Sequence, residues 1–143
     1  FRRALEDRLA ALGLRGRTTL AGRLQDGALH AWYEAASIFV HPTLSEGSSL
    51  VTLEAMAHRR PVVATTAGGL PDKVRDGRTG WLVPPADAAA LSRALRAALA
   101  DRSPLATMGV AGRALVEAEF SWERSADRML AVFNDLRPEA GTA

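Results

Sequence analysis

Short apolar runs that end near proline or glycine alternate with segments of helical periodicity along this chain. The runs lie at 38–40, 62–64 and 81–83, and Pro42 and Pro84 follow the first and the last of them. Uninterrupted apolar runs of this kind are typical of strands buried on both faces of a parallel sheet. Strands that alternate with helices form βαβ units. The pattern predicts an α/β fold in which helices flank a parallel sheet.

The helices are predicted from apolar residues that recur every three or four positions. The first helix is expected to end at Gly13, and Asp26, Asp87 and Ser121 are expected to act as N-caps of three later helices. A further helix is expected over 48–58. These segments would cover the sheet.

Two further expectations concern a short run near the N-terminus and the three tryptophans. The run Thr18–Ala21 is β-prone and is closed by Gly22. Trp32, Trp81 and Trp122 each lie on an apolar face, so we expect them in the core.

The length of the chain suits one domain. Its 143 residues open on Phe1, with no initiator methionine, and helix-like sequence follows at once. We therefore expect a piece of a longer protein, in which residues 1–137 form a domain that is truncated on its N-terminal side and residues 138–143 form a flexible tail.

Composition excludes several classes of protein. The absence of cysteine rules out disulfides and thiolate metal sites, and it fits a cytoplasmic location. The net charge is only +2, and the basic residues are spread along the chain, so a nucleic-acid interface is not indicated. No stretch approaches the ~20 apolar residues of a membrane span.

Ligands of parallel sheets bind in a crevice at the carboxyl ends of the strands. Three loops are therefore of interest: His41–Ser49, Thr65–Leu70 and the loop at Gly22. The first runs into the segment EGSSLVTLE, from Glu46 to Glu54. Free backbone N–H groups and the helix dipole at such a helix start attract a phosphate, although the serine hydroxyls would serve equally as helix caps.

The two carboxylates of this segment suggest a ligand of a given length. With a helical rise of about 1.5 Å per residue, the eight residues from Glu46 to Glu54 would span about 12 Å. This is close to the distance between the hexose and the ribose of a nucleotide sugar. One carboxylate would bind sugar hydroxyls and the other the ribose diol, with the pyrophosphate between them. The alternative is two solvated carboxylates that flank an amphipathic helix.

The run from Ile38 to Pro85 resembles the signature of GT-B retaining glycosyltransferases of the GT4 type. The matching pieces are FVHPTLSEGSSLVTLEAMA, PVVATTAGGLPDKV and DGRTGWLVPPAD, and the closing FSWERSADRML also agrees in pattern. The resemblance implies a Rossmann-like sheet that forms the C-terminal, nucleotide-sugar-binding half of a bacterial-type transferase.

The resemblance also implies roles for single residues. Glu46 would be the catalytic-site carboxylate that binds sugar hydroxyls near the reacting carbon, and Glu54 would hold the ribose. Backbone amides would bind the hexose and the pyrophosphate, and a loop would lie against the base. The donor-binding residues so implied are Gly47, Ser48, Ser49, Leu50, Val51, Gly22 and Arg23.

The chemistry implied is transfer of a hexose from a nucleotide diphosphate sugar, with retention and without a metal or other cofactor. The acceptor, a sugar, a lipid or a small molecule, would be bound mainly by an N-terminal domain, together with the upstream Arg/Lys pair that clamps the pyrophosphate. The full-length protein would be cytoplasmic, with peripheral membrane association as an option. This piece alone would be inactive.

The sequence departs from the family pattern at two notable positions. Ser48 replaces a common aromatic residue, which leaves the sugar specificity open, and Asp72 stands where glutamate is usual.

Gly68 and Gly69 form either a simple tight turn or a ligand contact. His41 is expected to anchor its loop rather than to catalyse, and three scattered histidines do not indicate a zinc site.

Two other functions remain as alternatives. One is a non-catalytic module that binds nucleotide sugars, which the intact Glu46 and Glu54 would equally support. The other is a flavodoxin-like signalling domain, but that class needs clustered acidic residues at strand ends, and none of the three loops carries such a cluster.

Overall fold

The computed structural model describes residues 1–136, so the tail expected over 138–143 lies outside the described residues. Its centre is a parallel sheet of β1 (Phe39–His41), β2 (Val62–Thr65) and β3 (Gly80–Val83), in the order β1-β2-β3. The register pairs Phe39 with Val62, and Val62 with Gly80. The predicted α/β fold with a parallel sheet is confirmed.

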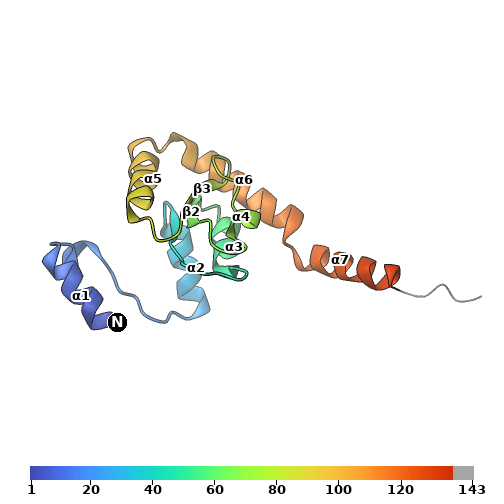
Figure 1. The fold of residues 1–143 in the computed structure, drawn as a ribbon, viewed down its shortest axis with the longest axis horizontal. Coiled ribbons are helices and arrows are strands. Elements are labelled where there is room, and N and C mark those ends of the chain that lie inside the picture. Colours follow the sequence, from blue (N-terminus) through green and yellow to red (C-terminus); the bar gives the residue numbers. More distant parts are fainter. Residues whose placement is uncertain (137–143) are drawn as a thin grey trace, which may run out of the picture.

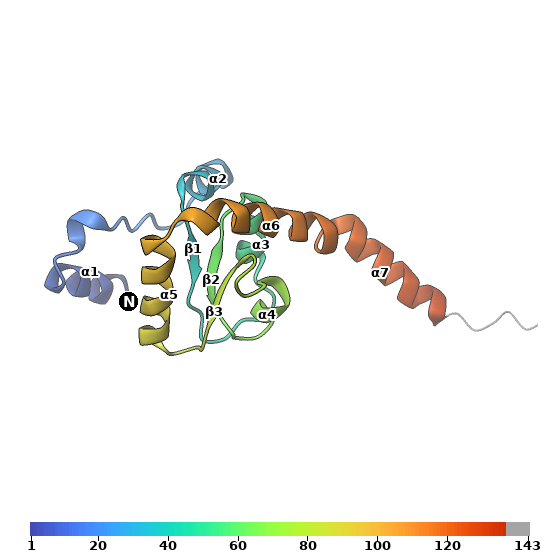
Figure 2. The ribbon, with the colours of Figure 1, turned by 90° about the horizontal axis from the view of Figure 1, so that it is seen from above.

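Helices cover both faces of the sheet (Figure 1). The helices of the described chain are α1 (Arg2–Ala11), α2 (Asp26–Ala35), α3 (Leu50–Ala57), α4 (Leu70–Lys73), α5 (Ala88–Ala100), α6 (Ser103–Glu119) and α7 (Trp122–Asp135), with a 3-10 turn at Arg15–Arg17, and α1 and α7 lie away from the sheet. Figure 2 shows α5 on one side of the sheet and α3 with α4 on the other. Asp87 and Ser121 cap α5 and α7, as expected. The expectation that Asp26 is the N-cap of α2 is wrong, because Asp26 is the first residue of that helix and Gln25 holds the N-cap position.

The core lies between β2 and the helices beside it. All four residues of β2 are buried, because it is the central strand. Met56 of α3, Leu70 of α4 and Val74 complete the buried cluster. β1 is only half-buried, although its apolar run predicted full burial, because it lies at the edge of the sheet.

Two sequence expectations about buried or paired segments are wrong. Thr18–Ala21 forms no strand; Thr18 is extended (φ −130°, ψ 131°), but the run pairs with no strand of the sheet. Trp32 is 48% exposed and Trp122 is 86% exposed, so two of the three tryptophans are not in the core. The helix α7 projects away from the sheet (Figure 1), and most of its apolar face is exposed.

Candidate functional site

The start of α3 is the segment that the sequence predicts to bind a phosphate. Ser49 is its N-cap: its Oγ accepts a hydrogen bond from the Thr52 N–H at 3.4 Å and lies 2.8 Å from Thr52 Oγ1. Ser49 is buried, whereas Leu50 and Val51 are 64% and 40% exposed. The Ser49 hydroxyl therefore serves as a cap, and Leu50 and Val51 of the first turn are exposed to solvent.

The helix begins later than the distance estimate assumed. Residues 46–49 are not helical, so the helical rise does not apply to them, and the basis of the 12 Å estimate is wrong for this half of the segment.

The carboxylate of Glu46 is held by His41, at the end of β1. His41 Nε2 lies 3.1 Å from Glu46 Oε2, and His41 Nδ1 lies 3.4 Å from Ser49 Oγ. A carboxylate can only accept, so with a neutral ring Nε2 carries the proton and Nδ1 accepts from the Ser49 hydroxyl. His41 thus links the N-cap of α3 to Glu46, and the expected anchoring role has a defined partner.

The loop of Gly68 and Gly69 packs directly on the backbone of the Glu46 loop. Gly68 has φ +53°, and a Cβ at this position would collide with the carbonyl group of Glu46. A Cβ on Gly69 would lie 2.7 Å from the carbonyl oxygen of Gly47, which also accepts a hydrogen bond from the Gly69 N–H at 3.3 Å. The two glycines therefore allow the close approach of two strand-end loops.

Glu54 is held by Tyr33 of α2. The Tyr33 hydroxyl donates to Glu54 Oε2 at 3.0 Å, and its ring stacks on His58 with centroids 5.5 Å apart. Burial and, secondarily, the bond to Glu54 raise the pKa of Tyr33 to about 12. The phenol is therefore a protonated donor at neutral pH, and it fixes one oxygen of the carboxylate while the other remains available.

A buried lysine completes this region. Lys73, at the end of α4, donates from Nζ to Ser48 Oγ at 3.0 Å. An open pocket of about 480 Å³ lies beside these groups, with Ser48, Leu50, Glu54 and Lys73 among its lining residues. Polar groups from α3 and α4 thus meet an apolar wall that includes Trp122.

Gly22 and Arg23 lie apart from this region. The segment before α2 extends away from the sheet (Figure 1), and the atom nearest to a Cβ built on Gly22 belongs to Arg2. The structure therefore brings together the loops of Glu46 and Gly68 but not the loop of Gly22, whose contact with a base stays a prediction.

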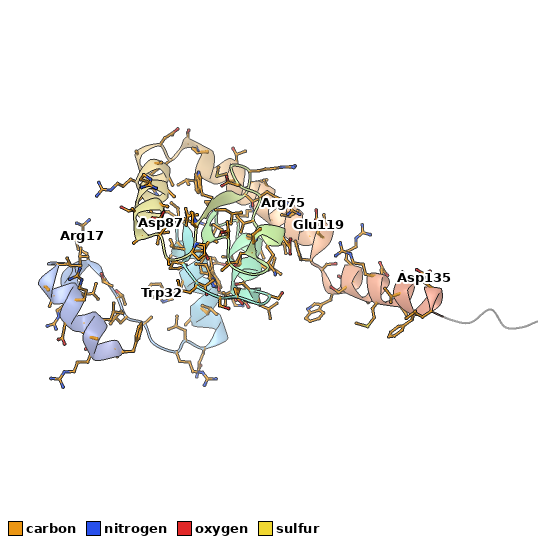
Figure 3. All side chains as sticks on the ribbon, in the orientation of Figure 1. Arg17, Trp32, Arg75, Asp87, Glu119 and Asp135 are labelled. Carbon is orange, nitrogen blue, oxygen red and sulfur yellow. The ribbon has the colours of Figure 1, made fainter. Side chains whose placement is uncertain are left out.

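The turn that follows α4 is tied to neighbouring elements rather than fully solvated. Arg75 Nη2 lies 3.4 Å from Glu119 Oε2, near the end of α6 (Figure 3). Asp76 Oδ1 accepts a hydrogen bond from the Leu82 N–H at 2.9 Å. Arg78 is exposed.

Among residues 1–136, no group of three or more His, Cys, Asp or Glu side chains is arranged to hold a metal ion. Within the same range, no helix combines the length and the apolar character that crossing a bilayer would require.

The family model of glycosyl transferases group 1 matches residues 2–101 of the chain. The chain is 49% identical to the D-inositol 3-phosphate glycosyltransferase of Streptomyces scabiei over 96 residues, which are 66% of the chain and 21% of that protein. The chain belongs to the glycosyl transferases group 1 family.

Two solved structures share the fold. Sucrose-phosphate synthase from Thermosynechococcus elongatus matches with a TM-score of 0.85 and 39% identity, over 94% of this chain and 34% of that one. The HepE protein of Anabaena, in a complex with UDP, matches with a TM-score of 0.86 and 24% identity, over 95% of this chain and 37% of that one. These neighbours have the GT-B fold that the sequence predicted. The chain spans only about a fifth to two fifths of the proteins it matches.

Three residues of the site were not predicted in their present roles: Tyr33, His41 as the partner of Glu46, and Lys73. Tyr33 and Lys73 reach the site from other helices, so their spacing along the chain carries no signal. Two other features of the sequence could have pointed to these residues. His41 directly follows an expected strand, where ligand-binding loops begin, and Lys73 is the single lysine of the sequence.

Proposed function

We propose that this chain is the donor-binding half of a transferase that moves a hexose from a nucleotide diphosphate sugar to an acceptor with retention. One observation carries the proposal. An open helix start lies between two carboxylates, and each carboxylate is oriented by a side chain from a different element, through the contacts His41–Glu46 and Tyr33–Glu54.

The carboxylates would act at the two ends of the donor. Glu46 would accept hydrogen bonds from hexose hydroxyls near the reacting carbon, and Glu54 would accept them from the ribose diol. Each carboxylate keeps one oxygen free of the contact described above, which suits a hydroxylic ligand.

The diphosphate would lie on the first turn of α3, against the amides of Ser49, Leu50 and Val51. The helix dipole and unpaired N–H groups favour an anion there. As a leaving group the diphosphate gains charge in the transition state, so preorganised donors at this point would lower the barrier. We propose that protein groups do this without a metal ion, together with basic residues from outside this chain.

The acceptor would be a sugar, a lipid or a small molecule held mainly by a second domain. We place the full-length protein in the cytoplasm, with peripheral membrane association if the acceptor is a lipid. The second candidate is a non-catalytic module for nucleotide sugars, because the groups described here account for binding by themselves.

A kinetic experiment separates the two candidates. In the full-length protein, Glu46→Gln should lower kcat by about 10²-fold or more and leave nucleotide affinity within about twofold, since its contacts strengthen in the transition state. The assay is transfer from UDP-, GDP- and ADP-sugars to a broad acceptor set, read by mass spectrometry. Wild-type protein that binds a nucleotide sugar but forms no product with any acceptor would favour the non-catalytic module.

A further inference from the structure

Lys73 is a buried cation in a chain that otherwise relies on arginine. It is the single lysine among 18 basic residues, and only 5% of it is exposed. Its ammonium donates to the neutral hydroxyl of Ser48 at 3.0 Å. A buried ammonium with this one neutral partner has lost hydration without gaining an opposite charge.

Among the residues that the structure describes, no carboxylate oxygen lies within 4.0 Å of the Lys73 ammonium. The ion pairs found there involve arginines and histidines, and none includes Lys73 within 4.0 Å. The neighbouring Asp72 is exposed. An anionic ligand beside this ammonium would supply an opposite charge that the nearby described residues do not supply within 4.0 Å.

The ammonium lies where two parts of the site meet. Its Nζ is 3.8 Å from the position of a Cβ on Gly69, so it lies against the loop that packs on Gly47. The ammonium also donates to Ser48, which directly precedes Ser49, the N-cap of α3. Lys73 and Ser48 both line the pocket that Glu54 borders.

We propose that the Lys73 ammonium binds a phosphate group of the donor, together with Ser48 and the first turn of α3. The inference rests on the proposed function for the identity of the donor. Ser48 Oγ accepts from Lys73, so its own proton is free to be donated to the same phosphate oxygen. A compact ammonium is suited to this place, because the broader guanidinium of an arginine would need more room between the glycine loop and α3.

The test compares Lys73→Met with Arg78→Met in the full-length protein. Each variant loses one positive charge, and Arg78 is exposed and lies outside the site. Calorimetry uses inorganic pyrophosphate, UDP and uridine as probes. Lys73→Met should weaken pyrophosphate and UDP about tenfold, as loss of a charge-assisted hydrogen bond implies, and leave uridine unchanged. Arg78→Met should match the wild type.

Thermal unfolding distinguishes binding from a structural role. Without ligand, Lys73→Met should have a Tm equal to or above that of the wild type, because a buried uncompensated charge is replaced by an apolar side chain of similar size. A lower Tm with unchanged pyrophosphate affinity would overturn the proposal, as would a wild type that binds no pyrophosphate. Pyrophosphate binding that depends on Lys73, without binding of any nucleotide sugar, would support Lys73 and contradict the proposed function alone.

Discussion

Each of the two carboxylates of the site is oriented by one side chain, Glu54 by a distant residue and Glu46 by a nearby one. Tyr33 precedes Glu54 by 21 positions and donates to it from a buried phenol. His41 precedes Glu46 by five positions and is the last residue of the edge strand β1. Glutamates alone would sample several rotamers. The partners reduce that freedom before a ligand arrives, which lowers the entropy cost of binding.

Tyr33→Phe removes only the hydroxyl that holds Glu54. We expect nucleoside diphosphate binding to weaken by about 1 kcal/mol, or about fivefold, because the carboxylate is no longer oriented toward the ribose. A 2′,3′-dideoxynucleoside diphosphate lacks the hydroxyls that Glu54 would bind, so its affinity should be the same for both proteins. Calorimetry measures all four pairs. Equal losses for the two ligands would mean that Tyr33 acts only on the packing of α2.

His41→Asn keeps a polar group near the position of Nδ1 but removes the Nε2 donor to Glu46. We expect kcat to fall about tenfold, equivalent to ~1.4 kcal/mol, with KM for the donor within about twofold, since Glu46 would act near the reacting carbon. Arg93→Gln, an exposed position on α5 away from the two carboxylates, serves as the control. Steady-state rates at saturating acceptor give both constants. A kcat equal to that of the control would remove His41 from the positioning of Glu46.

At the scale of elements, the glycine loop after β2 and the loop after β1 form one unit. Gly68 meets the carbonyl of Glu46 so closely that any side chain would displace it. The two carboxyl-terminal strand ends are therefore coupled through backbone contact, and the geometry of Glu46 depends on a loop that follows it by more than 20 residues.

Gly68→Ala and Gly77→Ala separate this contact from backbone strain. Both glycines have positive φ, +53° and +70°, but a Cβ at Gly77 would meet nothing within 4 Å. Gly77→Ala should cost about 1 kcal/mol of unfolding free energy from strain alone, and Gly68→Ala about 2–4 kcal/mol. Denaturant unfolding of both variants measures the difference. Equal costs would show that the Glu46 loop moves away freely.

The sequence predicted the elements that local patterns define. The runs at β2 and β3 were recognised because proline or glycine bounds them and their neighbours have helical periodicity, and Asp87 and Ser121 were recognised as caps from residue type and place. Trp32 and Trp122 were misplaced because periodicity shows that a face is apolar but not what covers it. For the same reason the local motif predicts Glu46 and Glu54 as site residues but carries no sign of Tyr33 and Lys73, which contact Glu54 and Ser48 from other helices.

At the scale of the whole molecule, the described chain is a central sheet with two extensions. The helix α1 and the helix α7 project from opposite ends (Figure 2), and α7 presents a row of exposed apolar residues. Met129, Leu130 and Phe133 are each about 60% exposed. The compact part between these helices contains every group assigned to the donor except Gly22 and Arg23.

The most direct test is a crystal structure of the full-length protein with a bound nucleoside diphosphate, beginning with UDP. We expect the distal phosphate to lie on the first turn of α3, with an oxygen within about 3 Å of the amide nitrogen of Leu50 or Val51, and Glu54 to accept hydrogen bonds from the ribose diol. A nucleotide bound away from α3, or one whose ribose lies beyond the reach of Glu54, would contradict this expectation.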